Sequence, residues 1–373
     1  MRSLGWCLAF LLSLEVAAPA IAAPPQVRAT SYVLLDGSTG EVLASRLPDR
    51  RLPMASTTKV MTGLLALESG PAERTIVVPS AAIAIGESSS KLVAGEAISV
   101  GNLLKGLLVG SGNDAAVALA SGLAPSQFAF VRRMNRRAGQ LGLTNTRYAN
   151  PHGLDQASHY SSTRDLITLS RVAMRRPAFR AIVANRRTTI PGPAGRGVRL
   201  LESENTLLSI DPLADGIKTG HTAGAGYSLV AHATSDELGV GLFYSAIGAP
   251  SEATRARDAK RILAWGFAQF AHPTVIAVDT IVARVPVRDR QGVTLEAGVA
   301  APVEVAVRLG RPLSARIIAP PDIIGPVVAG ARIGEVQIRS GEQTLRRVPL
   351  IAKNSVAGPG IGDRLRSAFR AVA

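Results

Sequence analysis

Two side chains that could carry out nucleophilic catalysis lie three residues apart near the start of an apolar stretch. Ser56 and Lys59 occur in RLPMASTTKVMTG, residues 51–63. Residues i and i+3 of a helix share one face, so a helix that begins near Ser56 would bring its hydroxyl within hydrogen-bonding reach of the Lys59 amine. An amine in that place can accept the hydroxyl proton and activate the serine as a nucleophile.

The lysine is unusual for this chain, because only six of its 42 basic residues are lysines. Val60, Met61, Leu64 and Leu65 continue the stretch with few polar breaks, which predicts a buried helix. Burial makes the charged amine costly and lowers its pKa, so a neutral amine becomes available as a base. Arginine stays protonated and cannot take this role. We therefore interpret Lys59 as the base.

The same spacing occurs a second time, so the pair alone is weak evidence. Ser88 and Lys91 lie in GESSSKLVAGE, residues 86–96. The segment LVAGE that follows is typical of a strand and a turn, so this serine and lysine need not face each other. The helical context favours Ser56 as the nucleophile.

Two further motifs make the signal specific. Ser111-Gly112-Asn113 stands at a break between two apolar helical runs in LLVGSGNDAAVALA, and Lys218-Thr219-Gly220 leads into a predicted strand. Ser-x-x-Lys, Ser-x-Asn and Lys-Thr-Gly in this order are the motif set of penicillin-binding proteins and serine β-lactamases. Each motif alone is equally typical of a turn or a cap, but the three together rarely arise by chance.

The chain resembles the low-molecular-mass penicillin-binding proteins that act as D-alanyl-D-alanine carboxypeptidases. The resemblance covers nearly the whole chain after residue 22 and extends to YANPHGLD, KTGHT, RARDAKRILAWGF and a C-terminal VPLIA before a basic tail. It departs at AGAG, residues 223–226, where the family often has an acidic residue. It implies an α+β fold, with a β-lactamase/transpeptidase-like catalytic domain, an antiparallel sheet flanked by helices, followed by a small β-rich domain.

The resemblance also implies a role for each catalytic residue. Ser56 would attack the carbonyl between the two terminal D-alanines, and Lys59 would accept its proton. Ser111 would relay a proton toward the leaving amine. Asn113 would hydrogen-bond the substrate amide or Lys59. Lys218 would help to keep Lys59 neutral and would orient Ser111.

The substrate-binding residues that the resemblance implies are Thr219, Gly220, His221, Thr222 and Arg255. The oxyanion would lie between the backbone N–H groups of Ser56 and His221, so the imidazole of His221 need not act. The terminal carboxylate needs a cation or hydroxyls, for which Thr219, Thr222 and Arg255 are candidates. Arg255 could equally be a solvated charge on its helix.

The elements that must position these residues follow two periodicities. SYVLLDGSTGEVLASR, residues 31–46, predicts a strand, a turn and a strand, and residues 225–248 predict two later strands. Helices are predicted between them at residues 56–69, 100–122, 126–141 and 163–176. Helices bracketed by strands from both ends of a segment favour an α+β layer fold. We expect this catalytic domain at residues 27–271.

The hydrophobic pattern of the sequence changes after residue 273. Val303, Val305 and Val307 alternate with polar residues, and Gly and Pro separate further runs of the same kind. This pattern predicts a β-rich domain at residues 274–352.

Both ends of the chain carry export or surface signals. Residues 1–22 are typical of a signal peptide, with Arg2, an apolar run from Trp6 to Leu14 that is too short to span a bilayer, and Ala20-x-Ala22. Its removal would take away Cys7, the only cysteine, which excludes disulfides and thiol chemistry.

Residues 357–373 predict an amphipathic helix that lies on an anionic membrane surface. Its apolar face consists of Ile361, Leu365, Ala368, Phe369 and Val372. A terminal helix docked on the β-rich domain is the alternative. The Gly/Pro hinge NSVAGPG before it favours the anchor.

Composition limits the partners. The net charge of +15 favours a polyanion or an anionic membrane, although a generally arginine-rich chain would give the same surplus. Aromatic residues make up 4% and no groove-reading motif occurs, so nucleic acid is not expected. No metal-binding, Gly-x-Ser-x-Gly or phosphate-loop motif occurs, and we expect neither metal nor cofactor. His152, in NPHGLD, is interpreted as part of a turn near the site.

Taken together, the resemblance implies an exported serine carboxypeptidase at the periplasmic face of the cytoplasmic membrane. Its partners would be peptidoglycan stem peptides, from which it removes the terminal D-alanine, and β-lactams, which would acylate Ser56. A DD-endopeptidase of the same fold usually lacks the second domain. A class A β-lactamase lacks both the β-rich domain and the basic tail. A non-catalytic wall-binding scaffold is disfavoured because all three motifs are intact.

Overall fold

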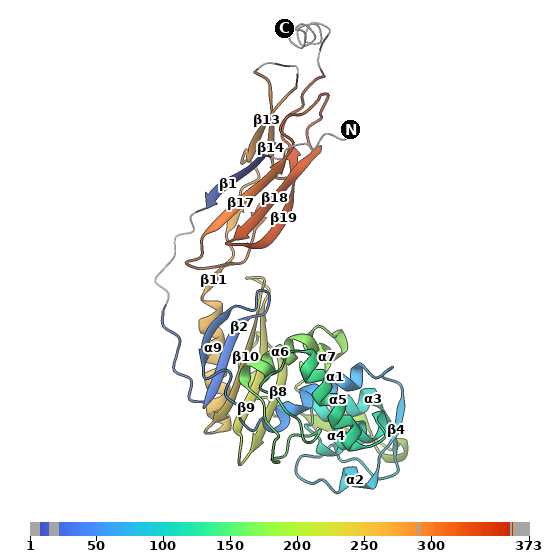
Figure 1. The fold of residues 1–373 in the computed structure, drawn as a ribbon. Helices are drawn as coiled ribbons and strands as arrows, with labels where there is room; N and C mark the ends of the chain where they lie inside the picture. The colour runs from blue at the N-terminus through green and yellow to red at the C-terminus, as the bar shows by residue number, and fades with distance from the viewer. Residues whose placement is uncertain (1–7, 15–21, 289, 291, 359, 361–373) are drawn as a thin grey trace. The chain divides into compact units, whose positions relative to one another are not determined.

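The structure, a computed structural model, describes residues 8–14, 22–288, 290, 292–358 and 360 (Figure 1). These residues fall into two units. The first comprises residues 23–236 and 240–268, and the second contains the residues from 269 onward.

An antiparallel sheet of five strands organises the first unit. Its order is β3-β2-β10-β9-β8. The strands are β2 (Ser31–Asp36), β3 (Val42–Arg46), β8 (Ala214–Thr222), β9 (Gly226–Ser235) and β10 (Val240–Ala249). The two strand pairs predicted at 31–46 and 225–248 are confirmed, and β2 joins them by pairing with β10. Lys218, Thr219 and Gly220 were predicted to lead into a strand but lie inside β8, which begins four residues before Lys218.

Helices cover both faces of this sheet. Every residue of β2 is buried, and because strand side chains alternate between faces, both faces must be covered. Helix α9 (Glu252–Phe267) and helix α6 (Thr163–Met174) each pack on β2, β9 and β10, and Figure 1 shows them on opposite sides.

A cluster of helices surrounds α1 (Lys59–Leu67), which is buried from its first residue to Ala66. The other helical elements of the unit are η1 (Ala55–Thr58), α2 (Ser80–Ile83), α3 (Val100–Leu108), α4 (Asn113–Leu123), α5 (Gln127–Gln140), α7 (Pro177–Val183), η2 (Pro193–Gly195) and α8 (Leu207–Ile210), which packs on α9 and β8. Helix α1 contacts α3, α4, α5, α6 and α7. A helix with so many neighbours must be apolar on all sides, which is why its sequence shows no polar face.

The helical stretch predicted at residues 100–122, with a break at Ser111–Asn113, is two helices, α3 and α4. They are separated at residues 109–112, where Ser111 has a positive φ of 55°. The predictions at 126–141 and 163–176 correspond to α5 and α6. Pro177 then begins α7, because proline is favoured at the first position of a helix and disfavoured further in.

The structure contains three short strand pairs that the sequence did not predict. Two lie in the first unit and one lies just after its last residue. Strands β4 (Thr75–Val77) and β5 (Ala97–Ser99) pair, as do β6 (Arg187–Pro191) and β7 (Val198–Glu202). Strand β11 (Phe270–Ala271) pairs with β16 (Val307–Arg308) in the second unit. Strands of two to five residues give too few alternations to be recognised in the sequence.

The second unit is β-rich, as predicted. Its main sheet has the order β1-β17-β18-β19-β14-β13. The strands are β13 (Ala283–Pro286), β14 (Thr294–Gly298), β17 (Leu313–Ala319), β18 (Arg332–Ser340) and β19 (Gln343–Ala352), with β12 (Thr274–Ile276) paired to β15 (Val303–Glu304) outside it. Val303, Val305 and Val307 are all buried in its core, as their alternation indicated.

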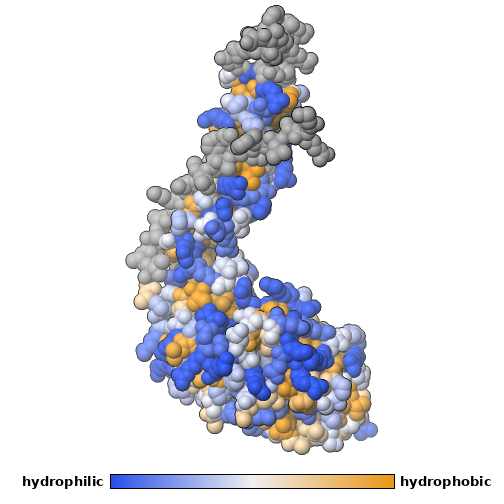
Figure 2. Space-filling view, viewed as in Figure 1, coloured by the Kyte–Doolittle hydropathy of each residue, from blue (hydrophilic) through white to orange (hydrophobic). Residues whose placement is uncertain are grey.

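The predicted terminal segments are only partly described. Leu8–Leu14 forms β1, which pairs antiparallel with β17. The rest of the predicted signal peptide up to residue 21 lies outside the described residues, as do residue 359 and residues 361–373 of the predicted amphipathic helix. In the described part of the chain, no single helix has the length and apolar character to cross a bilayer. Helices α4 and α5, bent by 91°, meet that test only as a pair. Figure 2 shows a surface on which apolar side chains are scattered among hydrophilic ones.

Candidate active site

Ser56 and Lys59 lie together at the start of α1. Ser56 belongs to the 3-10 turn η1, and Lys59 is the first residue of the α-helix. Side chains at i and i+3 eclipse in a 3-10 turn, so the pair is brought together more directly than in the predicted α-helix. The Nζ of Lys59 is 2.8 Å from the Oγ of Ser56. The expected proximity of the hydroxyl and the amine is therefore observed.

The amine of Lys59 is fully buried and has a neutral partner. Its Nζ donates to Oδ1 of Asn113 at 2.7 Å. The pKa of Lys59 lies well below its ordinary value, first because of burial and second because of the positive charge of Lys218. A neutral amine keeps a lone pair for the Ser56 proton, so Lys59 meets the requirement for a base.

Asn113 is held by the segment that contains the second Ser-x-x-Lys spacing. Its Nδ2 donates to the carbonyl of Gly86 at 3.2 Å, and its backbone N–H donates to the carbonyl of Ser88 at 2.8 Å. Ser88 thus contributes a backbone oxygen, whereas Lys91 is exposed and has a positive φ of 58°. Ser88 and Lys91 do not lie on a helix, in contrast to the Ser56 pair.

Asp114 ties the same segment to α4. Its carboxylate accepts the N–H groups of Ser90 at 2.9 Å and Leu92 at 3.2 Å, and the hydroxyl of Ser89 at 2.7 Å. These bonds fix the loop that in turn holds Asn113. Ser111 lies two residues before Asn113. It is 1% exposed and has the backbone strain that non-glycine residues carry at positive φ.

Lys218 is the second buried lysine. It is 2% exposed, and its Nζ donates to the carbonyl of Thr219 at 2.9 Å. Burial lowers its pKa to about 8, with nearby Glu204 acting in the opposite direction and Arg255 adding to the decrease. At neutral pH Lys218 therefore keeps its proton, and its positive charge favours the neutral form of Lys59. Its orientation of Ser111 stays a prediction.

Strand β8 passes directly beside the nucleophile. A Cβ at Gly220 would lie 2.8 Å from the backbone nitrogen of Ser56 and 2.9 Å from the Cβ of Ala55. Only glycine allows this approach. It places the strand next to the N–H of Ser56, and His221 follows in the same strand. The ring of His221 is exposed and stacks on Tyr227, with ring centroids 4.1 Å apart.

The residues that are candidates for binding the substrate carboxylate differ in their burial and in their hydrogen bonds. Thr219 is buried, whereas the Thr222 hydroxyl donates to Asp155 at 2.8 Å. Arg255 is 5% exposed, so it is not a solvated charge. Its Nη2 donates to the carbonyl of Glu204 at 3.1 Å, and its guanidinium lies 5.9 Å from the centroid of the Tyr227 ring.

The comparison with known families agrees with this geometry. Residues 18–247 match the family described as D-alanyl-D-alanine carboxypeptidase. The chain belongs to this carboxypeptidase family. Residues 270–357 match the C-terminal domain of penicillin-binding protein 5.

Relatives span almost the full length. The D-alanyl-D-alanine carboxypeptidase DacC of Escherichia coli is 32% identical over 356 residues, which cover 91% of this chain and 87% of DacC. The solved penicillin-binding protein 5 of Haemophilus influenzae has a TM-score of 0.65 and 29% identity, covering 90% of this chain and 99% of that one. The Streptomyces K15 DD-transpeptidase has a TM-score of 0.63 and 30% identity, and covers 66% of this chain.

In this member of the carboxypeptidase family, a turn that contains His152 and Gly153 packs beside the nucleophile. The sequence predicted a turn near the site but not its contact with Ala55. Gly153 has a φ of 106°, and a Cβ there would lie 2.1 Å from the carbonyl oxygen of Ala55. His152 forms part of that turn, since its Nδ1 accepts the N–H of Leu154 at 3.2 Å. Burial lowers the pKa of His152 to about 4. The turn packs against the backbone that precedes Ser56.

His159 was not identified from the sequence. Its Nδ1 accepts the N–H of Ala149 at 3.0 Å, so its Nε2 carries the proton and donates to Thr58 Oγ1 at 2.8 Å. The Thr58 hydroxyl donates to the carbonyl of Ala55 at 2.8 Å. Burial lowers the pKa of His159 to about 4, which keeps this neutral tautomer at neutral pH. The bonds connect His159 to the residues on both sides of Ser56.

Glu204 is the other functional residue that the motifs did not reveal. It is exposed, and its negative charge raises the pKa of Lys59, Lys218 and Arg255. Such a residue has no local sequence signal, because its influence depends on the folding of the segment after β7 beside β8. Among the described residues, no three His, Cys, Asp or Glu side chains come together in a way that could hold a metal ion.

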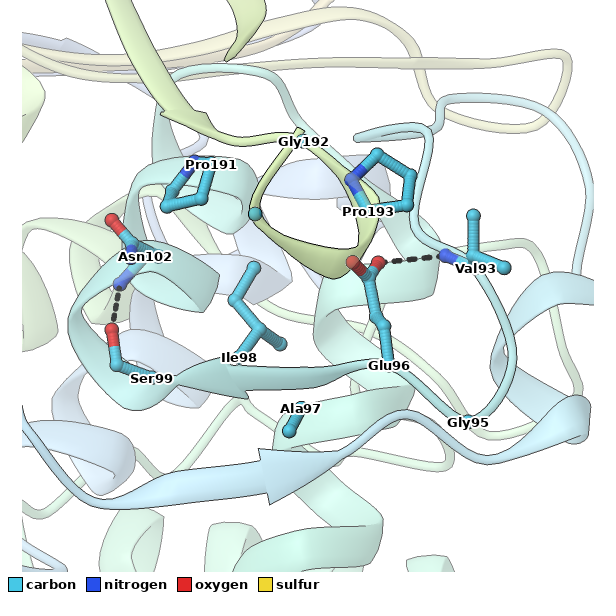
Figure 3. A pocket seen from close by; sticks show the side chains of 11 residues that line it. Val93, Gly95, Glu96, Ala97, Ile98, Ser99, Asn102, Pro191, Gly192 and Pro193 are labelled. Atoms are coloured by element: carbon cyan, nitrogen blue, oxygen red, sulfur yellow. Dashed lines mark hydrogen bonds between the residues drawn. The ribbon is translucent and has the colours of Figure 1, made fainter. Parts of the chain in front are cut away.

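A cavity of about 590 Å³ lies elsewhere in the first unit, between residues 93–102 and the tip of the β6–β7 hairpin (Figure 3). None of the predicted catalytic residues lines it. The Glu96 carboxylate in its wall accepts the N–H of Val93 at 2.7 Å and pairs with Arg199 at 2.6 Å. Its charge is therefore already balanced, and we assign the cavity no part in catalysis.

The charge of Glu204 predicts a pH effect. The roles predicted for the two lysines require neutral Lys59 and protonated Lys218, so the rate should fall as the pH rises through about 8, where Lys218 loses its proton. Glu204→Gln removes a negative charge and lowers both lysine pKa values, so this fall should begin at lower pH, by less than about one pH unit. The measurement is the acylation rate by a fluorescent penicillin against pH. Glu202→Gln, at an exposed carboxylate on β7, is the control and should leave the profile unchanged.

The hydrogen bonds of His159 predict a positioning effect. His159→Ala leaves Thr58 and Ala149 without their partner, which should cost about 1–3 kcal/mol of unfolding free energy. Displacement of Ser56 should also slow acylation, by up to about 10²-fold. Acylation is measured on protein whose circular dichroism shows it to be folded. His272→Ala, at an exposed histidine, should match the unsubstituted protein. Unchanged acylation in folded His159→Ala would show that the network does not position Ser56.

Proposed function

We propose that this protein is an exported serine carboxypeptidase that removes the terminal D-alanine from peptidoglycan stem pentapeptides. Its family and enzyme class are those of the D-alanyl-D-alanine carboxypeptidases. The observation that carries the proposal is the buried Lys59 amine of lowered pKa, 2.8 Å from the Ser56 hydroxyl, with β8 beside it. An arginine at this position would stay protonated and could not serve as the base.

The reaction proceeds by acylation and hydrolysis. Ser56 Oγ attacks the carbonyl carbon between the two D-alanines while its proton passes to Lys59 Nζ. The N–H groups of Ser56 and His221 stabilise the oxyanion. When the C–N bond breaks, the leaving D-alanine amine takes a proton, which Ser111 relays from Lys59. Water then attacks the ester carbonyl while Lys59 takes its proton, the bond to Ser56 Oγ breaks, the proton returns to Oγ, and the tetrapeptide leaves.

The substrate enters as an extended backbone beside β8. Within the described residues β8 is the last strand of its sheet, so its outer backbone groups have no partner strand there. An extended peptide can pair with such an edge. The terminal carboxylate would lie near Thr219 and protonated Lys218, with Arg255 adding positive potential from behind Tyr227.

The same site explains the proposed binding of β-lactams. A β-lactam carbonyl takes the place of the scissile carbonyl, and its ring opens when Ser56 attacks. The covalent product has no departing amine, so it stays in the site longer than the peptide acyl group does.

The proposed location is the periplasmic face of the cytoplasmic membrane. It is supported by the export signal at residues 1–22, by the amphipathic pattern of residues 357–373 and by the net charge of +15. Substrates assembled at that membrane would then be within reach.

Labelling with a fluorescent penicillin tests the nucleophile. Ser56→Ala should abolish the covalent label, because the bond forms at its Oγ. Ser88→Ala should retain full labelling, since that serine contributes only a backbone carbonyl near the site. Loss of label in Ser88→Ala alone would overturn the assignment.

The same preparations should release D-alanine from a soluble pentapeptide, detected by mass spectrometry as conversion to the tetrapeptide. Cleavage of cross-linked dimers in place of the pentapeptide would indicate an endopeptidase. Rapid turnover of penicillin would indicate a β-lactamase.

Deletion of residues 357–373 tests the location. The shortened protein should leave the membrane fraction and keep its activity on soluble pentapeptide, because the deleted residues lie far along the chain from the catalytic motifs. Sedimentation of cell fractions measures the distribution. If the shortened protein still sediments fully with membranes, the tail is not the anchor.

A further inference from the structure

An uncharged loop in the second unit exposes aliphatic side chains beside the start of the C-terminal tail. It connects β17 to β18, and the nine residues from Ile323 to Ala331 contain no charged side chain. We call residues 323–328, with the sequence IIGPVV, the apolar loop. Loops at protein surfaces are normally polar, so four Ile and Val residues among six require a physical reason.

The apolar loop has one inward and one outward side. Ile323 and Val327 pack on a small core of Val287, Leu295, Ala352 and Val356. Ile324 and Val328 point away from it and are 59% and 68% exposed. Core packing therefore explains the inner pair but not the outer pair.

Hydrogen bonds fix the loop in this orientation. Val327 and Val356 exchange backbone hydrogen bonds of 2.9 and 2.8 Å. The N–H of Arg288 donates to the carbonyl of Ile323 at 2.8 Å, and that of Ala329 to Ser355 Oγ at 2.9 Å. The exposure of Ile324 and Val328 is thus built into the unit.

The loop adjoins the residues from which the tail departs. Val356 is the last residue before the predicted amphipathic segment 357–373. A Cβ at Gly325 would lie 2.7 Å from the carbonyl oxygen of Ala357. Arg290 donates to the same carbonyl at 3.1 Å. Any surface that the amphipathic segment binds is therefore close to Ile324 and Val328.

The charges around the loop are mixed but include arginines suited to an anionic surface. Arg288 pairs with Asp322 at 2.7 Å, and Arg290 follows it. Exposed aliphatic side chains with nearby arginines match the composition of segments that insert into the headgroup region of anionic bilayers.

We propose that Ile324 and Val328 form a second membrane contact, which enters the headgroup region of an anionic lipid surface next to the C-terminal tail. This inference rests on the membrane location given under the proposed function. Two adjacent anchors would hold the second unit in a defined orientation at the membrane, whereas a tail behind a Gly/Pro hinge alone would leave it free to rotate.

A single-cysteine probe tests the contact directly. In the chain from residue 23 to 373, which contains no cysteine of its own, Val328→Cys is labelled with an environment-sensitive fluorophore and mixed with phosphatidylglycerol vesicles. A blue shift of emission is expected. Ile281→Cys, at another exposed aliphatic residue of the same unit, is the matched control and should show no shift.

Binding measurements complete the test. Ile324→Ser with Val328→Ser should weaken co-sedimentation of the full chain with the vesicles several-fold, and Ile281→Ser should not. Unchanged penicillin labelling and thermal unfolding show that the variants are folded. Phosphatidylcholine vesicles should bind less in every case.

Other outcomes would overturn the proposal. If the double variant binds as tightly as the unsubstituted chain while deletion of 357–373 abolishes binding, the tail is the sole anchor and the proposed location stands. If the chain binds no vesicle, the location fails together with this contact. A blue shift without vesicles would show that the tail covers the loop, and a shift that grows with protein concentration would show self-association.

Discussion

The burial of one amine constrains the catalytic unit. Lys59 must be neutral to accept a proton, and burial together with the positive charge of Lys218 lowers its pKa. Its partner Asn113 supplies a carbonyl oxygen without a charge. An aspartate in that position would restore the proton to the lysine and remove the base. The apolar cluster around α1 thus serves the chemistry as well as stability.

Charged residues from several other segments of the chain determine the pKa of this amine. Lys218 opposes a proton on Lys59, while Glu204, Asp114 and Glu87 favour it. Asp114 has two effects, since it also fixes the loop that holds Asn113. The loop with the second Ser-x-x-Lys spacing is therefore part of the support of the site, although its own serine and lysine do not form a pair.

The sequence predicted those features that depend on local spacing. The contact of Ser56 with Lys59 follows from three residues of separation, and the hairpins at 31–46 and 225–248 follow from alternation. The motifs near Asn113 and Lys218 were recognised by resemblance. Gly153, His159 and Glu204 were missed or only placed roughly, because their roles arise where distant segments pack together. The pairing of β2 with β10 joins residues more than 200 positions apart, and periodicity carries no information about such pairs.

The position of β8 at the end of its sheet has a cost. An unpaired strand edge invites association with any extended chain, and most proteins protect such edges by covering or charging them. Here a cover over the outer side of the Lys-Thr-Gly motif would also exclude the peptide. In the proposed binding mode the edge therefore stays open, and folded proteins are excluded, because only a short, flexible chain end can be laid out as an additional strand.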